Sequence, residues 1–216
     1  MQLEDFLADL PLLHTWDEGK TWNTGGFHKE SFEQLDDFFD NLPENPRIIE
    51  TGAGNSTLFF LIKNPGRLVT IAPDAELHQR ISSFCDQNRI DRSSYEPHIE
   101  ASQWALPQLA ADGDKFDFAL IDGSHNWPLV FVDFYYINAL LKADSFLMID
   151  DVQLHSVKEL SRLLMEQPGF ELVCHFQKSA IFKKLWDADL PDFGGQPYIL
   201  RKSAEYEASG NPFSLT

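Results

Sequence analysis

The sequence predicts an α/β protein with a doubly wound, mostly parallel seven-stranded sheet, helices on both faces and a terminal antiparallel β-hairpin. Three observations lead to this prediction. Five short apolar runs, typical of strands buried on both faces of a sheet, alternate with helical segments. Right-handed crossovers between such strands leave few arrangements other than a parallel sheet. Two further apolar runs near the C-terminus are separated by almost nothing, so they must pair as a hairpin.

The predicted elements alternate along most of the chain. The strands are expected at residues 47–51, 67–72, 95–101, 116–122, 145–150, 170–177 and 179–185. Helices are expected at residues 56–64, 74–88, 127–141 and 156–167, with a short turn at 104–110. Ahead of the first strand, a short N-terminal helix and a helix over residues 30–42 are expected, the latter ending before Pro43. Helices that separate successive strands in this way indicate βαβ units.

The 216 residues suit one main domain, which we place at residues 45–186 between two smaller segments. Residues 1–44 are expected to form a helical cap, in which Trp16, Trp22, His28 and Gly25-Gly26 indicate either a mobile cover over a site or a plain packed helix pair. Residues 187–216 form a tail, for which a substrate lid, an oligomer contact and a loose end all stay open. A homo-oligomer is therefore compatible with the sequence but not required by it.

Composition and charge narrow the class of partner. The net charge of −17, with no basic stripe, disfavours binding to nucleic acid or to an anionic membrane and favours a small-molecule partner. No run approaches the roughly 20 apolar residues that span a bilayer, and the acidic N-terminus lacks the basic region of a signal peptide. Cys85 and Cys174 are expected to be buried free thiols in a reducing compartment. These features predict a cytoplasmic protein.

Two of the predicted strands run into carboxylates. The run SFLMIDD ends in the adjacent acids Asp150 and Asp151, and the run FDFALID ends in Asp122. Ligands of open α/β sheets bind outside the carboxyl ends of the strands, and adjacent like charges there cost free energy unless a cation or ligand donors offset them. The three acids are therefore expected to form a hard oxygen site for Mg²⁺, Mn²⁺ or Ca²⁺. The alternative is that they only cap helices and solvate loops.

The first predicted strand leads into a glycine-rich loop, ETGAGNST. Gly52 and Gly54 allow a tight turn and the close approach of a ligand, and Ser56 with Thr57 opens a helix whose N-terminal amides attract negative charge. The loop lacks the third glycine of the dinucleotide fingerprint and the Gly-Lys-Ser/Thr of a P-loop. On its own this pattern is a weak signal.

An acid followed by G-x-G on the first strand, with a terminal β-hairpin, resembles the class I S-adenosylmethionine-dependent methyltransferases over roughly residues 45 to 186. The segment EASQWALPQL is similar to the adenine-binding Ala-Ser-Gln segment of catechol-type O-methyltransferases, and IDGSH is also similar to macrocin-type enzymes. The resemblance implies a Rossmann-like fold and S-adenosylmethionine as cofactor. The cofactor-binding residues it implies are Glu50, Thr51, Gly52, Ala53, Gly54, Asn55, Ser56, Asp74, Ser102, Gln103, Trp104 and Asp122.

The resemblance also bears on metal and catalysis. In catechol-type enzymes an Asp after the fourth strand and an Asp-Asn pair after the fifth bind Mg²⁺; the matching residues here are Asp122, Asp150 and Asp151, the last in place of Asn. His125 stands at the offset of the proposed general base and is expected to accept a proton near neutral pH. Its alternative role is to orient the loop or cap the next helix. His155 is expected mainly to mark a helix start.

One position departs from the family pattern. Most members end the second strand with an acid that binds ribose, whereas this chain has Ala72 there. Asp74, two residues later, is the candidate for ribose and is equally well placed as a helix N-cap. Trp104 is expected either to stack near adenine or to pack in the core.

The resulting hypothesis is a metal-assisted transfer of a methyl group from S-adenosylmethionine to a hydroxyl of a small molecule. A metal-independent methyltransferase with His125 as base is the first alternative. A nucleotide- or NAD-binding oxidoreductase and a non-catalytic cofactor-binding domain are the others. The sequence does not identify the acceptor.

Overall fold

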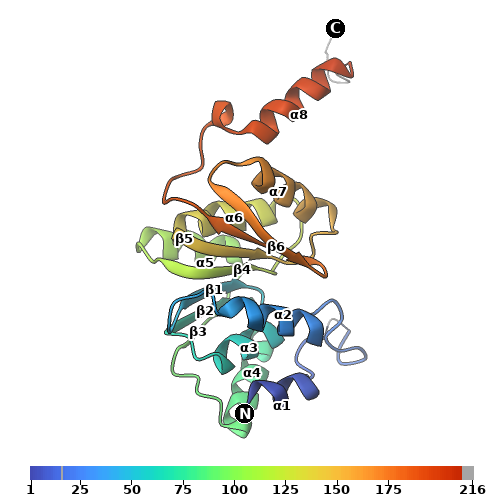
Figure 1. The fold of residues 1–216 in the computed structure, drawn as a ribbon. Coiled ribbons are helices and arrows are strands. Elements are labelled where there is room, and N and C mark those ends of the chain that lie inside the picture. Colours follow the sequence, from blue (N-terminus) through green and yellow to red (C-terminus); the bar gives the residue numbers. More distant parts are fainter. Residues whose placement is uncertain (16, 211–216) are drawn as a thin grey trace.

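A computed structural model of the chain, describing residues 1–15 and 17–210, confirms the predicted seven-stranded α/β sheet (Figure 1). Trp16, part of the expected N-terminal cover, lies outside the described residues. The strand order is β3-β2-β1-β4-β5-β7-β6, in which only β7 runs against its neighbours β5 and β6. The strands are β1 (Arg47–Thr51), β2 (Arg67–Ile71), β3 (Tyr95–His98), β4 (Phe116–Ile121), β5 (Leu141–Ile149), β6 (Phe170–Phe176) and β7 (Ser179–Lys184).

Helices cover both faces of the sheet, in two layers that Figure 1 shows on opposite sides. One layer holds α1 (Leu3–Ala8), α2 (Lys29–Phe39), α3 (Asn55–Ile62) and α4 (Ala75–Asn88). The other holds α5 (Ser102–Ala111), α6 (Leu129–Leu140) and α7 (His155–Glu166). A 3₁₀ turn, η1 (Phe193–Gly195), and α8 (Pro197–Ala208) follow the last strand.

The period-two pattern of the buried strands explains why two cores form. In β1, Ile48 packs with the α1–α4 layer, whereas the next residue, Ile49, packs with the α5–α7 layer. In β4, Phe118 and Ala119 divide in the same way. Because successive side chains of a strand point to opposite faces, a continuous apolar run supplies both cores at once. The Phe-rich α2 and α3 fill the first core with edge-to-face and stacked rings, among them Phe32 on Phe59 at 5.3 Å.

The point at which the winding reverses positions the site. β1 pairs in parallel with β2 on one side and with β4 on the other, so the chain leaves β1 toward one half of the sheet and later returns to start the other half. Such a switch point leaves a crevice at the carboxyl ends of the strands. The glycine loop after β1 and the acidic loops after β4 and β5 all lie at this edge.

Three details of the predicted elements were wrong. Residues 104–110, expected as a short turn, belong to the ten-residue helix α5, which accommodates Pro107 in its interior. Strand β5 begins at Leu141, four positions before the predicted residue 145, because Leu141 already pairs with Phe116 across an irregularity in the ladder. The tail, in which no period was recognised, contains α8.

The tail leaves β7 at the amino edge of β5, away from the acidic loops. Helix α8 then packs on α7, where Tyr198 donates to Glu159 and Arg201 pairs with Glu166. In Figure 1 the C-terminal end of α8 extends beyond the body of the domain. Within residues 1–15 and 17–210, no helix has the length and apolar character needed to cross a membrane.

Candidate active site

The turn after β1 brings the glycine loop against the end of β4. Gly52 has φ +93°, and a Cβ at this position would lie 2.3 Å from the carbonyl oxygen of Asp122. Both the backbone conformation and the close approach therefore require glycine. The loop and the first acidic residue are held in contact through their backbones.

Gly54, two residues on, leaves free space beside the loop. Its backbone is buried with φ +156°, yet a Cβ added there would meet no heavy atom of the described residues within 4 Å. Next to it, the side-chain oxygen of Asn55 is buried without a hydrogen-bond partner among the described residues, while the amide nitrogen of Asn55 donates to the carbonyl of Pro11. Unfilled space with an unsatisfied acceptor at a helix N-terminus is what a bound polar ligand would complete. The loop therefore offers room and a hydrogen-bond acceptor to a polar ligand.

Glu50, predicted to bind the cofactor, lies beneath the loop. Its carboxylate is fully buried and accepts hydrogen bonds from Ser56 Oγ at 2.8 Å, Thr57 Oγ1 at 2.6 Å and Thr70 Oγ1 at 2.8 Å. Burial raises the pKa of Glu50 to about 7, and the three hydroxyl donors oppose that shift. Its contacts tie β1, β2 and the start of α3 together, so Glu50 and Ser56 shape the loop from below.

The pKa of Glu50 predicts a pH-dependent stability. Because the folded-state pKa is about 7 and the ordinary value is 4.5, the folded protein binds this proton more tightly than the unfolded chain does. The contribution of Glu50 to stability is therefore lost as the pH rises from about 4.5 to 7, on the order of 3 kcal/mol in all. Urea unfolding at about pH 5 and about pH 8 measures the free energy of unfolding at each pH. The difference between the two values is expected to be smaller for Glu50→Gln than for the wild type. The exposed Glu76→Gln is the control; equal differences in all three proteins would contradict the prediction.

Asp74 is the N-cap of α4. Its Oδ1 accepts from the backbone N–H of Leu77 at 3.0 Å, and its other oxygen lies 3.6 Å from a guanidinium nitrogen of Arg80. The capping interpretation of Asp74 is thus confirmed, and the carboxylate remains 45% exposed. Ala72, at the position of the usual ribose-binding acid, has its carbonyl bonded to the His78 ring at 3.0 Å. Ribose binding by Asp74 stays a proposal.

Removal of the Asp74 cap gives a second prediction. Asp74→Ala is expected to lower the free energy of unfolding by about 1 kcal/mol, because the Leu77 N–H loses its acceptor. Asp74→Asn retains a side-chain acceptor and is expected to stay close to the wild type. Chemical denaturation measures both variants. An Asn variant as unstable as the Ala variant would show that Asp74 acts through charge rather than as a cap.

The residues predicted to hold adenine open α5. Ser102 is nearly buried at the start of the helix, and Gln103 follows it, half-buried. Trp104 is 65% exposed, so its core-packing interpretation was wrong. Sequence reasoning missed Asp133 of α6, a fully buried carboxylate whose pKa is raised by burial to about 6, a shift that the nearby hydroxyls of Ser102 and Thr51 oppose. The signal for it was a single acid within the apolar run of residues 129–140.

The acidic loops bring three predicted residues together. Ligand atoms of Asp122, His125 and Asp151 lie within 4.8 Å of one another, and His125 Nε2 is 3.7 Å from Asp122 and 3.6 Å from Asp151. Burial lowers the pKa of His125, against the pull of Asp151 and Asp150, so the imidazole is neutral near pH 7. Burial and the neighbouring Asp150 raise the pKa of Asp122 well above its ordinary value. A neutral imidazole beside carboxylates is suited to accept a proton.

Asp150 is not part of this group. It is fully buried, accepts from Ser179 Oγ, and lies 2.7 Å from the ammonium of Lys178. The same ammonium donates to Asp151 Oδ1 at 2.9 Å. The three acids expected to hold a divalent cation therefore do not fit it as a set, because a lysine already lies between two of them. Lys178 is the principal residue that sequence reasoning missed.

The helix ends test the capping interpretation of His125 and the expected position of His155. The N-cap of α6 is Pro128, and no side chain caps this helix, so His125 does not cap it. The backbone carbonyl of His125 instead accepts from Ser156 Oγ at the start of α7. His155 is the first residue of α7, as expected, and is exposed.

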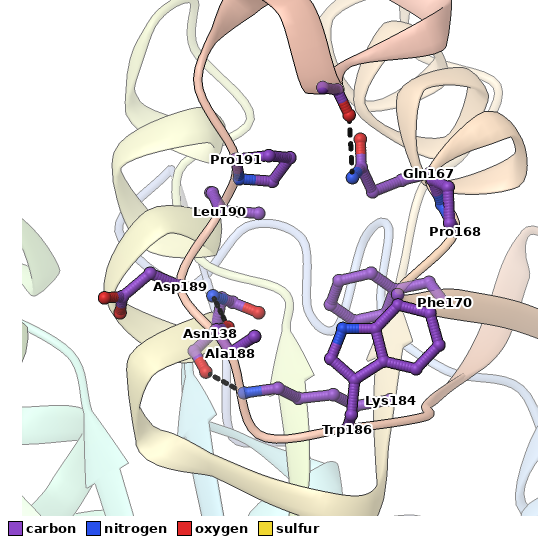
Figure 2. A pocket seen from close by; sticks show the side chains of 12 residues that line it. Asn138, Gln167, Pro168, Phe170, Lys184, Trp186, Ala188, Asp189, Leu190 and Pro191 are labelled. Carbon is purple, nitrogen blue, oxygen red and sulfur yellow. Dashed lines mark hydrogen bonds between the residues drawn. The ribbon is translucent and has the colours of Figure 1, made fainter.

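A separate cavity of about 320 Å³ lies at the opposite edge of the sheet (Figure 2). Phe170, Trp186 and the segment of the tail around Leu190 and Pro191 line it. The buried ammonium of Lys184 faces it but donates to the backbone carbonyls of Asn138 at 2.6 Å and Leu141 at 3.0 Å. The one buried charge among its lining residues is thus bonded to backbone and is not free for chemistry.

Comparison with protein families gives one match at the site-bearing part of the chain. A family model described as a methyltransferase domain matches residues 49–152, which run from β1 through the glycine loop to the acids after β5. A search of curated proteins gives no match.

Solved structures share the fold. The O-methyltransferase TomG from Streptomyces achromogenes, solved with S-adenosylmethionine, is 16% identical and has a TM-score of 0.62, over 75% of this chain and 82% of that one. An O-methyltransferase from Bacillus cereus, solved with S-adenosylhomocysteine, is 16% identical with a TM-score of 0.62, over 74% of this chain and 83% of that one. At this level of identity the likeness shows a common fold.

Proposed function

We propose, from the premise that this chain carries a class I S-adenosylmethionine-dependent methyltransferase domain, that it transfers a methyl group to a hydroxyl oxygen of a small molecule. The observation that carries the proposal is the position of a neutral His125 between Asp122 and Asp151 at the edge where the glycine loop opens. That the structural neighbours named above are O-methyltransferases supports oxygen as the acceptor atom.

The glycine loop and its surroundings would hold the cofactor. Gly54 leaves room for the methionine moiety, and Asn55 offers it an unsatisfied acceptor. Asp122 lies against the loop through its backbone contact with Gly52 and would receive the amino group. Ser102 and Gln103 would face adenine, as the family resemblance implies. Thr51, Ala53 and the exposed Trp104 complete the set without a specific contact assigned to them.

The protein's contribution to the reaction is alignment and proton removal. S-Adenosylmethionine supplies a methyl group that is already electrophilic on its sulfonium. His125 would accept the hydroxyl proton of the acceptor, and the bound cofactor would supply the methyl group, leaving S-adenosylhomocysteine as the product. Asp122 and Asp151 orient the imidazole and favour its protonated form once the proton has moved.

The test begins with cofactor identity. Isothermal titration with S-adenosylhomocysteine is expected to show one site per chain, whereas NAD is expected to show none. Incubation with S-adenosylmethionine carrying a labelled methyl group, and a panel of catechols, sugars and other polyols, then identifies the acceptor. Binding of NAD in place of S-adenosylhomocysteine would favour the oxidoreductase alternative. A tight complex with no turnover on any acceptor would favour a non-catalytic domain.

A further inference from the structure

The two-residue turn between β6 and β7 places Lys178 beside Asp150 and Asp151, at the carboxyl edge of the sheet, hereafter the acidic edge. Because β7 runs antiparallel to β5, with Ala180 opposite Ile149, the residues before β7 face the residues after β5. Ser179 thus meets Asp150, and Lys178 meets Asp151. The backbone N–H of Val152 donates to the Lys178 carbonyl at 2.9 Å, which fixes the turn against the acidic loop.

The Lys178 ammonium is bonded on several sides. It lies 2.7 Å from an Asp150 oxygen and 2.9 Å from an Asp151 oxygen, it donates to the Gly25 carbonyl, and it faces the Phe27 ring at 5.7 Å. Its side chain is 19% exposed, while that of Asp150 is 0% exposed. Two adjacent carboxylates removed from water repel each other unless a cation compensates them. Here a side chain of the protein supplies that compensation.

We propose that Lys178 is the resident counter-ion of the acidic edge, so that methyl transfer by this chain requires no divalent cation. The inference rests on the proposed function for its reaction and on the Lys178 contacts for its charge. A metal ion at Asp150 and Asp151 would have to displace an ammonium that is already bonded to both, as well as break its contact with the N-terminal segment at Gly25. A metal ion at the other possible set, Asp122, His125 and Asp151, would share Asp151, whose charge the same ammonium already compensates.

Lys178 acts on the reaction through Asp151 and is therefore a positioning residue. One Asp151 oxygen is held by Lys178 at 2.9 Å and by Gln153 at 2.8 Å. The other lies 3.6 Å from His125 Nε2. Asp151 also has φ +57°, a conformation in which Asp is enriched but which still needs support from its surroundings. Lys178 thus fixes the carboxylate that orients the base.

Manganese binding tests the proposal directly. Electron paramagnetic resonance of added Mn²⁺ measures the free ion in the presence of wild type, Lys178→Met, Lys178→Arg and the control Lys183→Met. The control removes the ion pair between Lys183 of β7 and Asp144 of β5. The wild type, Lys178→Arg and Lys183→Met are expected to bind Mn²⁺ only weakly, whereas Lys178→Met is expected to bind it at least about tenfold more tightly, because two carboxylates lose their counter-ion. Stoichiometric micromolar binding by the wild type would overturn the proposal, whether or not the Met variant folds.

Activity in a chelator provides the second readout. The wild type is expected to transfer methyl groups at the same rate in EDTA and in Mg²⁺. Lys178→Met is expected to be slower by about tenfold or more and to recover in part with Mg²⁺, while Lys178→Arg retains most of its rate. A wild type that is inactive in EDTA would overturn the proposal. Titration of S-adenosylhomocysteine into the same samples separates the two claims: loss of that binding contradicts the proposed function, and the Mn²⁺ result still decides the role of Lys178.

Discussion

Replacement of Gly52 by alanine is expected to abolish S-adenosylhomocysteine binding and to destabilise the domain by several kcal/mol. The added Cβ would lie 2.3 Å from the carbonyl oxygen and 2.9 Å from the carbonyl carbon of Asp122, both backbone atoms. A rotamer change cannot relieve a clash between backbones, so the loop after β1 and the loop after β4 must separate. That separation removes the space beside Gly54 where the cofactor is expected to bind. Titration calorimetry and urea unfolding measure the two effects.

Gly113 offers a matched control for Gly52. It also has a left-handed backbone, with φ +76° against +93° for Gly52, but a Cβ there would meet no atom of the part of the chain that the structure describes within 4 Å. Gly113→Ala therefore pays only the conformational cost of a side chain in this region, about 1–2 kcal/mol. The additional loss of unfolding free energy in Gly52→Ala, relative to Gly113→Ala, measures the effect of the contact with Asp122. Equal losses in the two variants, with cofactor binding retained in both, would contradict the predicted role of the contact.

Replacement of His125 by glutamine is expected to lower the rate of methyl transfer by about 100- to 10,000-fold while leaving cofactor affinity nearly unchanged. Glutamine preserves polarity and hydrogen bonding at this position but cannot accept the hydroxyl proton. The neighbouring carboxylates, 3.6 and 3.7 Å from Nε2 in the wild type, remain in place. Single-turnover rates with saturating acceptor isolate this step from binding.

His155→Gln is the control for His125→Gln. His155 is exposed at the first position of α7, outside the group formed by Asp122, His125 and Asp151, and its replacement is expected to leave the rate unchanged. A His125 variant with a normal rate would remove the base from the mechanism. A His155 variant as slow as the His125 variant would mean that the acceptor, or its base, lies nearer to the start of α7.

The sheet could be predicted from the sequence because its strands are buried on both faces. β1 has the predicted bounds of 47–51, and the other predicted strands differ mainly at their ends. Local pattern was insufficient where tertiary contact decides the structure. The interior Pro107 and the brevity of the apolar segment favoured a turn, yet α5 forms because it packs along α6 and its leucines fill the second core. Helix α8 was missed because it buries little beyond Tyr198 and so carries a weak apolar period.

The location of the candidate site could be predicted from the sequence, but the contacts between its side chains could be predicted only in part. Strand ends converge at the carboxyl edge, which brought Asp122, His125 and Asp151 together as expected from topology. The bonding of Asp150 depends on Ser179 and Lys178, which lie almost thirty positions later, and no local pattern connects them. The antiparallel pairing of β7 with β5 was the available signal: it sets the start of β7 beside the end of β5.

Because β7 runs antiparallel to β5, the turn before β7 lies at the carboxyl edge of the sheet, where an all-parallel sheet would place no hairpin turn. A hairpin with only two linking residues leaves its turn little conformational freedom. The position of the turn residues is therefore set by the register of the paired strands rather than by side-chain attraction. Insertion of one glycine into this turn is expected to move the Lys178 ammonium away from Asp150 and Asp151, although no charged group is removed from the chain. Relatives with a different hairpin length are accordingly expected to differ in their affinity for Mg²⁺ at the acids after β5.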